Sequence, residues 1–287
     1  MYRYFEGWYF KQLSVQGTLA LIPAMHTDGR GNCSASIQMI TEDTVYCVNV
    51  PWDTFHKNRR RMRIMAGNSL FCANGIKLDI QTEELSAKGS LTFGPLSPIR
   101  YDIMGPFRYV PFMECIHSVF SMAHKVDGSI TINGREHVFE NAIGYIEGDR
   151  GRSFPKRYMW TQHTWQEKSY HSLILSVADI PCLGMQFTGI IGIVLYKGKE
   201  YRLATYLGAK VTHIGEGEIM VRQGKYSLYA KRLDGDIMQL RAPVLGSMTR
   251  LIREAPSCRV HYRFAKEDET LLDIYADHAG FEFEYDT

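Results

Sequence analysis

Short β-rich segments alternate with turn-forming residues along most of the chain, and no other feature constrains the fold as strongly. Residues 34–40 and 44–50 are β-rich and are separated by the polar residues 41–43, while residues 129–132 stand between an Asp-Gly and an Asn-Gly pair. Both pairs are strong hairpin signals, and many short strands with such turns are typical of antiparallel sandwiches and barrels. A helix is conceivable over residues 113–124, although their β-branched content disfavours it. We expect an all-β fold.

The second half of the chain repeats features of the first. Trp8 and Trp160 each begin a β-rich segment and are 152 residues apart, and Leu19 and Leu173 follow them at a spacing of 154 residues. Such self-similarity indicates a duplicated unit. We therefore predict two lipocalin-like antiparallel β-barrel halves packed together, residues 1–155 and residues 156–287. A barrel of about eight strands has room for one small ligand.

Composition and charge exclude several classes of protein. The 287 residues carry a net charge of +2, too little for a surface that binds nucleic acid. The chain contains no apolar run long enough to span a membrane as a helix, and its first residues, MYRYFEGWYFK, lack the apolar segment of a signal peptide. Six scattered cysteines without a CxxC pair indicate free thiols, so we expect a cytoplasmic protein.

Motifs for common cofactors are absent from the sequence. There is no HExxH, P-loop or GxSxG motif, and no GxGxxG motif follows a strand. We therefore expect neither a metal nor another cofactor. One basic run stands out, and it consists of Lys57, Arg59, Arg60, Arg61 and Arg63. It is either a solvated loop or a peripheral contact with an anionic membrane surface, where each basic residue adds about 1 kcal/mol.

A pair of carboxylates is the strongest chemical signal. Glu147 and Asp149 are two residues apart, so on an extended strand they point to the same side. Two like charges held close together raise the pKa of one carboxyl group, which makes it a proton donor near neutral pH. The alternative is a charged turn, because Glu-Gly-Asp-Arg-Gly is also a reasonable loop sequence. A second unusual segment, Tyr4 to Lys11, is aromatic on both faces and contains Glu6.

Three motifs in order resemble the tocopherol cyclase family: YFEGWYFK at residues 4–11, MGPF followed by MECIHSV at residues 104–119, and GYIEGDRGRSFPKRYMWTQ at residues 144–162. The chain is similar, more loosely, to the carotenoid hydratase group, which shares a design of two barrels. The resemblance implies an isomerase that protonates the alkene of a prenylated hydroquinone and closes a chromanol ring. This reaction needs an acid, a dry site and a group that stabilises a cation, but no metal or nucleotide.

The resemblance also implies roles for residues. The expected catalytic residues are Asp149 or Glu147 as the acid, with Tyr145 and Trp160 in an aromatic wall that stabilises the cation. The residues expected to bind a small hydrophobic isoprenoid substrate are Glu6, Trp8, Glu114, His117 and Gln162. Two other functions stay open: a hydratase, in which water traps the cation, and a lipid carrier without catalysis.

Overall fold

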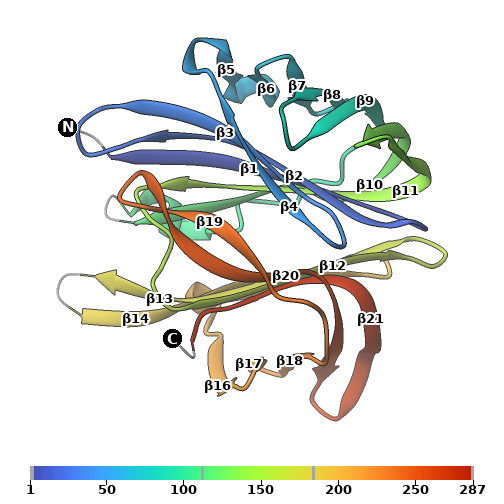
Figure 1. Cartoon of the computed structure of the whole chain (residues 1–287). Coiled ribbons are helices and arrows are strands. Elements are labelled where there is room, and N and C mark those ends of the chain that lie inside the picture. Colours follow the sequence, from blue (N-terminus) through green and yellow to red (C-terminus); the bar gives the residue numbers. More distant parts are fainter. Residues whose placement is uncertain (1–2, 111–112, 183–184, 286–287) are drawn as a thin grey trace. The chain divides into compact units, whose positions relative to one another are not determined.

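The computed structural model describes residues 3–110, 113–182 and 185–285, which form antiparallel strands joined by turns and short 3₁₀ helices (Figure 1). The chain divides into two compact units. Unit 1 contains Met1–Ile99, His117–Ser153 and Ala242–Arg250, and unit 2 contains Arg100–Ile116, Phe154–Arg241 and Leu251–Thr287. The expected all-β class with two barrel-like halves is confirmed. Each unit also contains a segment from the other half of the sequence.

Unit 1 is built on an eleven-stranded antiparallel sheet that is nearly closed. Its strands are β1 (Tyr4–Ser14), β2 (Gly17–Thr27), β3 (Cys33–Ile40), β4 (Val45–Val50), β5 (Phe55–Asn58), β6 (Arg63–Ala66), β7 (Ser69–Cys72), β8 (Gly75–Gln81), β9 (Ser86–Phe93), β10 (Cys115–Ile132) and β11 (Arg135–Gly151). Their order is β4-β3-β2-β1-β11-β10-β9-β8-β7-β6-β5. Because β3 also contacts β6, the two ends of the sheet approach each other. The 3₁₀ helices η1 (Trp52–Thr54) and η2 (Arg59–Arg61) flank β5.

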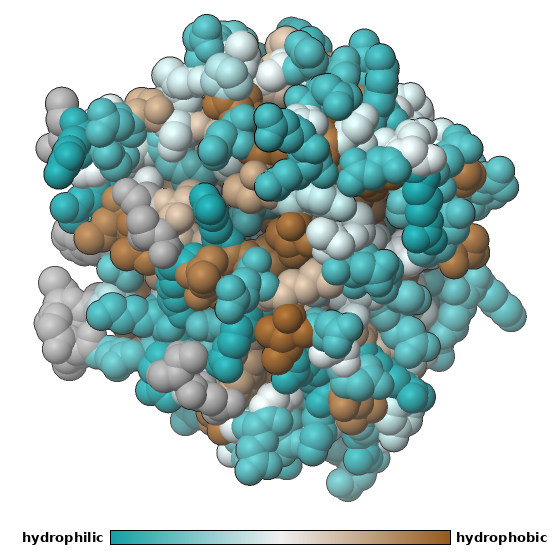
Figure 2. All heavy atoms as spheres, in the orientation of Figure 1, coloured by the Kyte–Doolittle hydropathy of each residue, from teal (hydrophilic) through white to brown (hydrophobic). Residues whose placement is uncertain are grey.

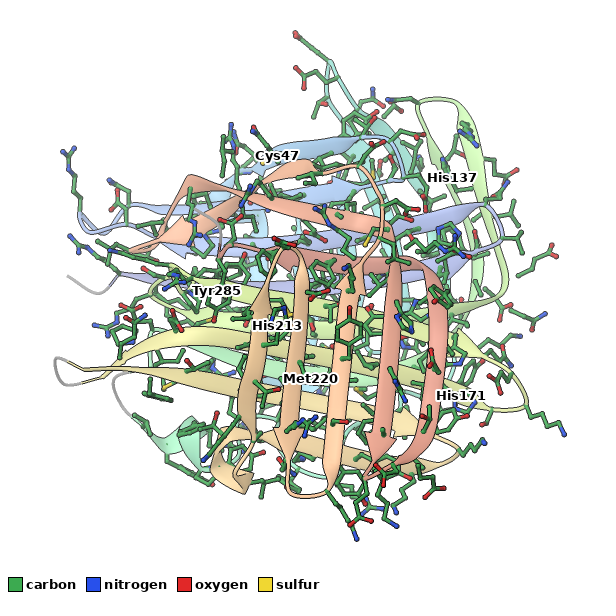
Figure 3. All side chains as sticks on the ribbon, turned by 90° about the horizontal axis from the view of Figure 1, so that it is seen from below. Cys47, His137, His171, His213, Met220 and Tyr285 are labelled. Carbon is green, nitrogen blue, oxygen red and sulfur yellow. The ribbon has the colours of Figure 1, made fainter. Side chains whose placement is uncertain are left out.

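Unit 2 is built on a second large sheet. Its strands are β12 (Tyr158–Gln166), β13 (Tyr170–Cys182), β14 (Met185–Tyr196), β15 (Lys199–Ala204), β16 (Lys210–Gly215), β17 (Glu218–Gln223), β18 (Tyr226–Arg232), β20 (Ser247–Lys266) and β21 (Glu269–Phe283), with β19 (Met238–Val244) paired to β20. Their order is β15-β14-β13-β12-β21-β20-β18-β17-β16. Figure 3 labels His213 on β16 and Met220 on β17, which are register partners. The 3₁₀ helices are η3 (Gly105–Tyr109) and η4 (Thr205–Leu207).

One face of the unit 1 sheet forms the hydrophobic core. Trp8 and Phe10 of β1 belong to this core, and Phe10 pairs with Leu21 on β2 and Ile146 on β11, which belong to it too. Directly paired residues of antiparallel strands point to the same face, and successive residues of a strand alternate. Tyr9 therefore points to the opposite face, yet it is also buried. We call these two surfaces of the sheet the core face and the opposite face.

The two sheets share a topology, but the sequence repeat is out of register. In both sheets the first strand of the half, β1 or β12, lies between the second and the last strand of that half, as duplication predicts. Leu19 and Leu173 are both core residues. Trp8 is a core residue, whereas Trp160 follows the core residue Met159 and so points to the opposite face. The equivalence of the two tryptophans was therefore wrong, since a slip of one residue exchanges the faces of a strand.

The helix that was conceivable over residues 113–124 does not form, because β10 runs through Cys115–Ile132. Within the described residues, no helix is both long and apolar enough to cross a membrane. The surface seen in Figure 2 is mostly hydrophilic, with scattered hydrophobic side chains.

Candidate active site

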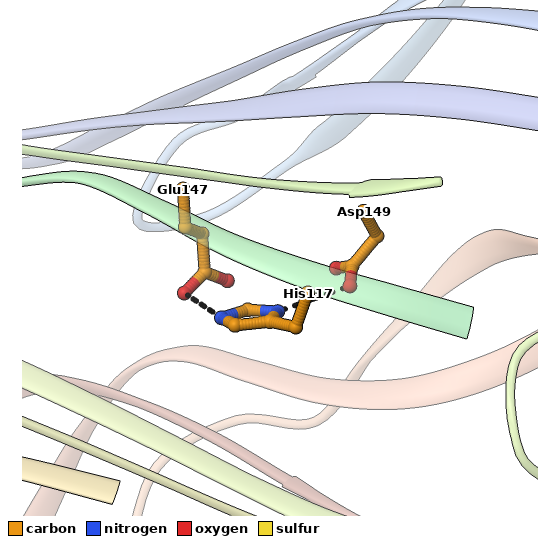
Figure 4. Close-up of side chains that lie close together, drawn as sticks. All are labelled: His117, Glu147 and Asp149. Atoms are coloured by element: carbon orange, nitrogen blue, oxygen red, sulfur yellow. Dashed lines mark hydrogen bonds and ion pairs between the residues drawn. The ribbon is translucent and has the colours of Figure 1, made fainter. Parts of the chain in front are cut away.

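The two carboxylates predicted from the sequence lie on either side of a histidine ring (Figure 4). Glu147 and Asp149 project from β11 to the same side, and His117 reaches between them from the beginning of β10. Nδ1 of His117 lies 3.0 Å from Oδ1 of Asp149, and Nε2 lies 3.3 Å from Oε2 of Glu147. Each ring nitrogen of the histidine therefore faces a carboxylate oxygen.

A buried tyrosine extends this cluster. The hydroxyl of Tyr145 donates a hydrogen bond of 2.6 Å to Oε2 of Glu147. Burial and the charge of Glu147 raise the pKa of the Tyr145 phenol well above its ordinary value. The phenol therefore remains a proton donor to Glu147 at neutral pH. The four side chains form a continuous row, which we call the acid cluster: Tyr145, Glu147, His117 and Asp149.

The surroundings of His117 favour the protonated form of its ring, because they raise its pKa. Burial by itself would lower the pKa of His117, but the charges of Asp149 and Glu147 and the hydrogen bonds to them raise this pKa well above the ordinary value. An imidazolium between two carboxylates stores a proton that can pass to either oxygen. The side chain of Asp149 is 23% exposed and that of Glu147 only 6%. Asp149 is thus the more accessible end of the row.

The cluster lies on the opposite face of the unit 1 sheet, away from the core. Glu147 pairs with Tyr9 and Tyr145 pairs with Lys11, so these two residues of β1 share its face. Both are buried, and Lys11 is only 4% exposed. Sequence reasoning missed Tyr9 and Lys11. Their spacing of two residues in YFEGWYFK was the available signal, but the pairing of β1 with β11 was not visible.

Glu6 and Trp8 belong to a different environment. Both project to the core face, where Glu6 accepts a hydrogen bond of 3.0 Å from the hydroxyl of Tyr4 and forms an ion pair with Lys57. The ammonium group of Lys57 also lies 5.8 Å from the centre of the Trp8 ring. The sheet therefore places these two predicted residues on the side away from the acid cluster.

The remaining predicted residues belong to unit 2. Trp160 and Gln162 lie on β12, on the face of their sheet that points away from its core, and both are buried. The amide nitrogen of Gln162 donates a hydrogen bond of 2.7 Å to Thr164. Glu114 is half-buried just before β10. The acid cluster itself consists of unit 1 residues alone.

Three residues of the cluster also have the chemistry of metal ligands. One ligand atom from each of His117, Glu147 and Asp149 lies within 4.8 Å of the other two. Imidazole nitrogens and carboxylate oxygens bind divalent metals, but only a deprotonated imidazole can do so. Because both carboxylates favour the imidazolium, the arrangement favours a stored proton, and a metal would have to displace it.

The basic run forms the hairpin of β5, η2 and β6. The exposed side chains are those of Arg60, Arg61 and Arg63, while the side chain of Arg59 lies outside the described part of the chain. Lys57 differs from them, because it turns toward Glu6 and is only 22% exposed. Three arginines thus remain as candidates for contact with a membrane surface.

The fold and the acid cluster define a class of all-β proteins with two barrel-like units and a buried acid. The chain belongs to the tocopherol cyclase-like family, whose model matches residues 79–284. No curated protein sequence matches the chain. Among solved structures, a Nitrosomonas europaea protein assigned as AttH has a TM-score of 0.55 and 11% identity, covering 99% of this chain and 93% of its own. Kievitone hydratase from Nectria haematococca has a TM-score of 0.52 and 9% identity, covering 100% and 90%. At such identities the two structures establish the fold alone.

Proposed function

We propose that this protein is an isomerase that closes the ring of a prenylated hydroquinone by acid catalysis. The observation that carries the proposal is the buried ring of His117 between Asp149 and Glu147, whose charges raise its pKa. Protonation of an alkene requires a proton donor in a site with little water. Membership of the tocopherol cyclase-like family supports the same reaction class.

The proposed reaction conserves all atoms of the substrate. The proton of His117 passes to Asp149, whose carboxyl group gives it to the less substituted alkene carbon. The tertiary cation that forms is attacked by the phenol oxygen, which creates the new C–O bond. The phenolic proton returns to Asp149 and passes from there to Nδ1 of His117, so the cluster regains its starting state. Substrate and product are therefore isomers, and no oxidant or nucleotide is consumed.

The acid cluster also suits the cationic intermediate. Once its proton has left, the row carries two carboxylates and one neutral imidazole, and this negative charge stabilises a nearby cation. The rings of Tyr9 and Tyr145 on the same face add cation–π attraction of about 0.5–2 kcal/mol each.

Hydration of an isoprenoid double bond is the second candidate. The 23% exposure of the Asp149 side chain favours it, because water that reaches this carboxylate competes with the phenol for the cation. One of the structures with the same fold is a hydratase. The third candidate is a carrier, which would bind the lipid and leave it unchanged.

Isotopes distinguish the three functions in one experiment. The protein is incubated with a prenylated hydroquinone in D₂O that contains H₂¹⁸O, and the products are read by mass spectrometry. Ring closure adds one carbon-bound deuterium and no ¹⁸O, whereas hydration adds both. If the protein binds the quinol and converts none of it, the carrier function replaces the enzyme.

Variants test the acid. Asp149→Asn and Glu147→Gln should each lower turnover, and loss of the proton donor itself should cost about 10²- to 10⁴-fold while binding changes little. Asp127→Asn is the matched control, since Asp127 is an exposed carboxylate of the same unit that pairs with Lys125. Parent-like turnover in both acid variants would refute the assignment of the acid cluster.

A further inference from the structure

The core of unit 1 contains polar atoms that lack a partner. Among the described residues, Nε2 and Oε1 of Gln12 and Nε2 of His124 are buried without a hydrogen bond. Gln12 is 0% exposed and His124 is 1% exposed. Buried polar groups in proteins are nearly always hydrogen-bonded, so a partner outside the chain is expected at this place.

Gln12 and His124 both lie next to a glycine of the sheet. Gln12 on β1 pairs with Gly144 on β11, and it shares the core face with Phe10, two residues before it. The imidazole of His124 lies over Gly144, where a Cβ atom would clash with Nε2. The missing side chain of Gly144 thus lets the His124 ring approach the strand next to Gln12.

The hydrogen bond at Nδ1 of His124 determines whether the other ring nitrogen, Nε2, is a donor or an acceptor. Oγ of Ser121 donates to the carbonyl of Ala123 at 3.1 Å and accepts from the amide of Ser97. It must therefore also accept the 3.0 Å hydrogen bond from Nδ1 of His124. Burial lowers the pKa of His124 to about 4, so the ring is neutral at pH 7. Nε2 is then a bare acceptor that requires a donor.

The surroundings of these atoms are apolar. The ring of Phe93 lies 4.5 Å from the ring of His124, and Leu19 is the partner of Gln12 on β2. A carboxylate has no proton to offer His124, and a purely apolar ligand would leave all three atoms unpaired. A hydroxyl group suits both side chains, because it donates a hydrogen bond to Nε2 of His124 while it accepts one from Nε2 of Gln12.

We propose that the core of unit 1 contains a binding site for an apolar molecule with a hydroxyl group, such as a phenol, held by Gln12 and His124. This site is separate from the acid cluster, since His124 and Gln12 point to the core face and Glu147 points to the opposite face of the same sheet. The proposal therefore stands or falls independently of the isomerase function.

The first test compares two probes by calorimetry on the full chain. 4-Hexylphenol should bind with one-to-one stoichiometry, and its methyl ether, which cannot donate to His124, should bind about 3- to 10-fold more weakly. With ¹⁵N-labelled histidine, the signal of His124 Nε2, assigned by its absence in His124→Gln, should shift with the phenol and not with the ether. Equal affinity for both probes, or an unchanged His124 signal, would refute the proposal.

Variants locate the binding site. Gln12→Leu should weaken binding of 4-hexylphenol and abolish the preference for phenol over ether. Ser36→Ala is the matched control, because Ser36 has a buried hydroxyl without a partner on the opposite face of the same sheet. If Glu147→Gln loses the phenol while Gln12→Leu retains it, the phenol binds at the acid cluster and the proposal is refuted. If Gln12→Leu fails to fold, the comparison of the two probes and the His124 signal, both measured on the parent protein, still test the proposal.

Discussion

Replacement of His117 by glutamine tests whether this residue is an imidazolium in the folded protein. The pKa of His117 is raised by Asp149 and Glu147, from an ordinary value of about 6.5. A raised pKa stabilises the folded state fully below the unfolded pKa, and this stability is lost as the pH rises through the folded pKa. The stability of unit 1 should therefore fall above about pH 6.5, at up to about 1.4 kcal/mol per pH unit.

The variant should lose both stability and this slope. His117→Gln leaves two carboxylates without a buried cation, and removal of one partner of such a pair costs about 3–5 kcal/mol. Asp149 is partly exposed, so we expect the lower end of this range at pH 7. The difference in stability between parent and variant should shrink from pH 7 to pH 9, because His117 of the unfolded parent is deprotonated in this range while the folded state holds the proton.

The measurement is hydrogen exchange of β11 amides against urea at pH 6, 7, 8 and 9, which reports on unit 1 alone. His56→Gln serves as the control, because His56 is an exposed histidine of the same unit. If parent and His117→Gln differ by a constant amount across this range, His117 is not a stored proton. The acid cluster would then need another source for the proton of the reaction.

Three further predictions concern other parts of the chain. Lys57→Met should destabilise unit 1 by about 3 kcal/mol in urea unfolding, and addition of Glu6→Leu should restore most of this loss, because the pair is then removed as a whole. Neutralising Arg60, Arg61 and Arg63 together should weaken cosedimentation with anionic vesicles by about 1 kcal/mol per residue without a change in stability; equal sedimentation would leave a solvated hairpin. EDTA should leave turnover unchanged. A loss of turnover in EDTA that added zinc reverses would identify a metal at His117, Glu147 and Asp149.

The fold was predictable because its signals are local. The Asn-Gly pair acts within a few residues, and the structure has the expected turn after Ile132, where Asn133 and Gly134 have positive φ values. The turn expected at Asp127-Gly128 was wrong, because β10 runs through both residues, which pair with β9. The exchange of segments between the units was not predictable, since Ala242–Arg250 carries no signal for which sheet it joins.

The acid cluster was predictable only in part. The same-side placement of Glu147 and Asp149 follows from the period of a strand, and the structure has it. His117 was expected to place a substrate oxygen, yet it contacts both carboxylates. The sequence cannot reveal this contact, because His117 and Glu147 are 30 residues apart on different strands and nothing local sets their register.

Strand β1 shows why the faces could not be assigned. A half-exposed strand alternates between apolar and polar residues, and that alternation identifies its buried side. In β1 both sides are buried, and both the core face, with Trp8, and the opposite face, with Tyr9, carry aromatic side chains. The alternation of side chains along the strand then shows only that Glu6 lies on the same side as Gln12 and on the other side from Lys11. The same double burial gives this strand two chemical roles, because one backbone presents Gln12 to the core of unit 1 and Lys11 to the acid cluster's face of the sheet.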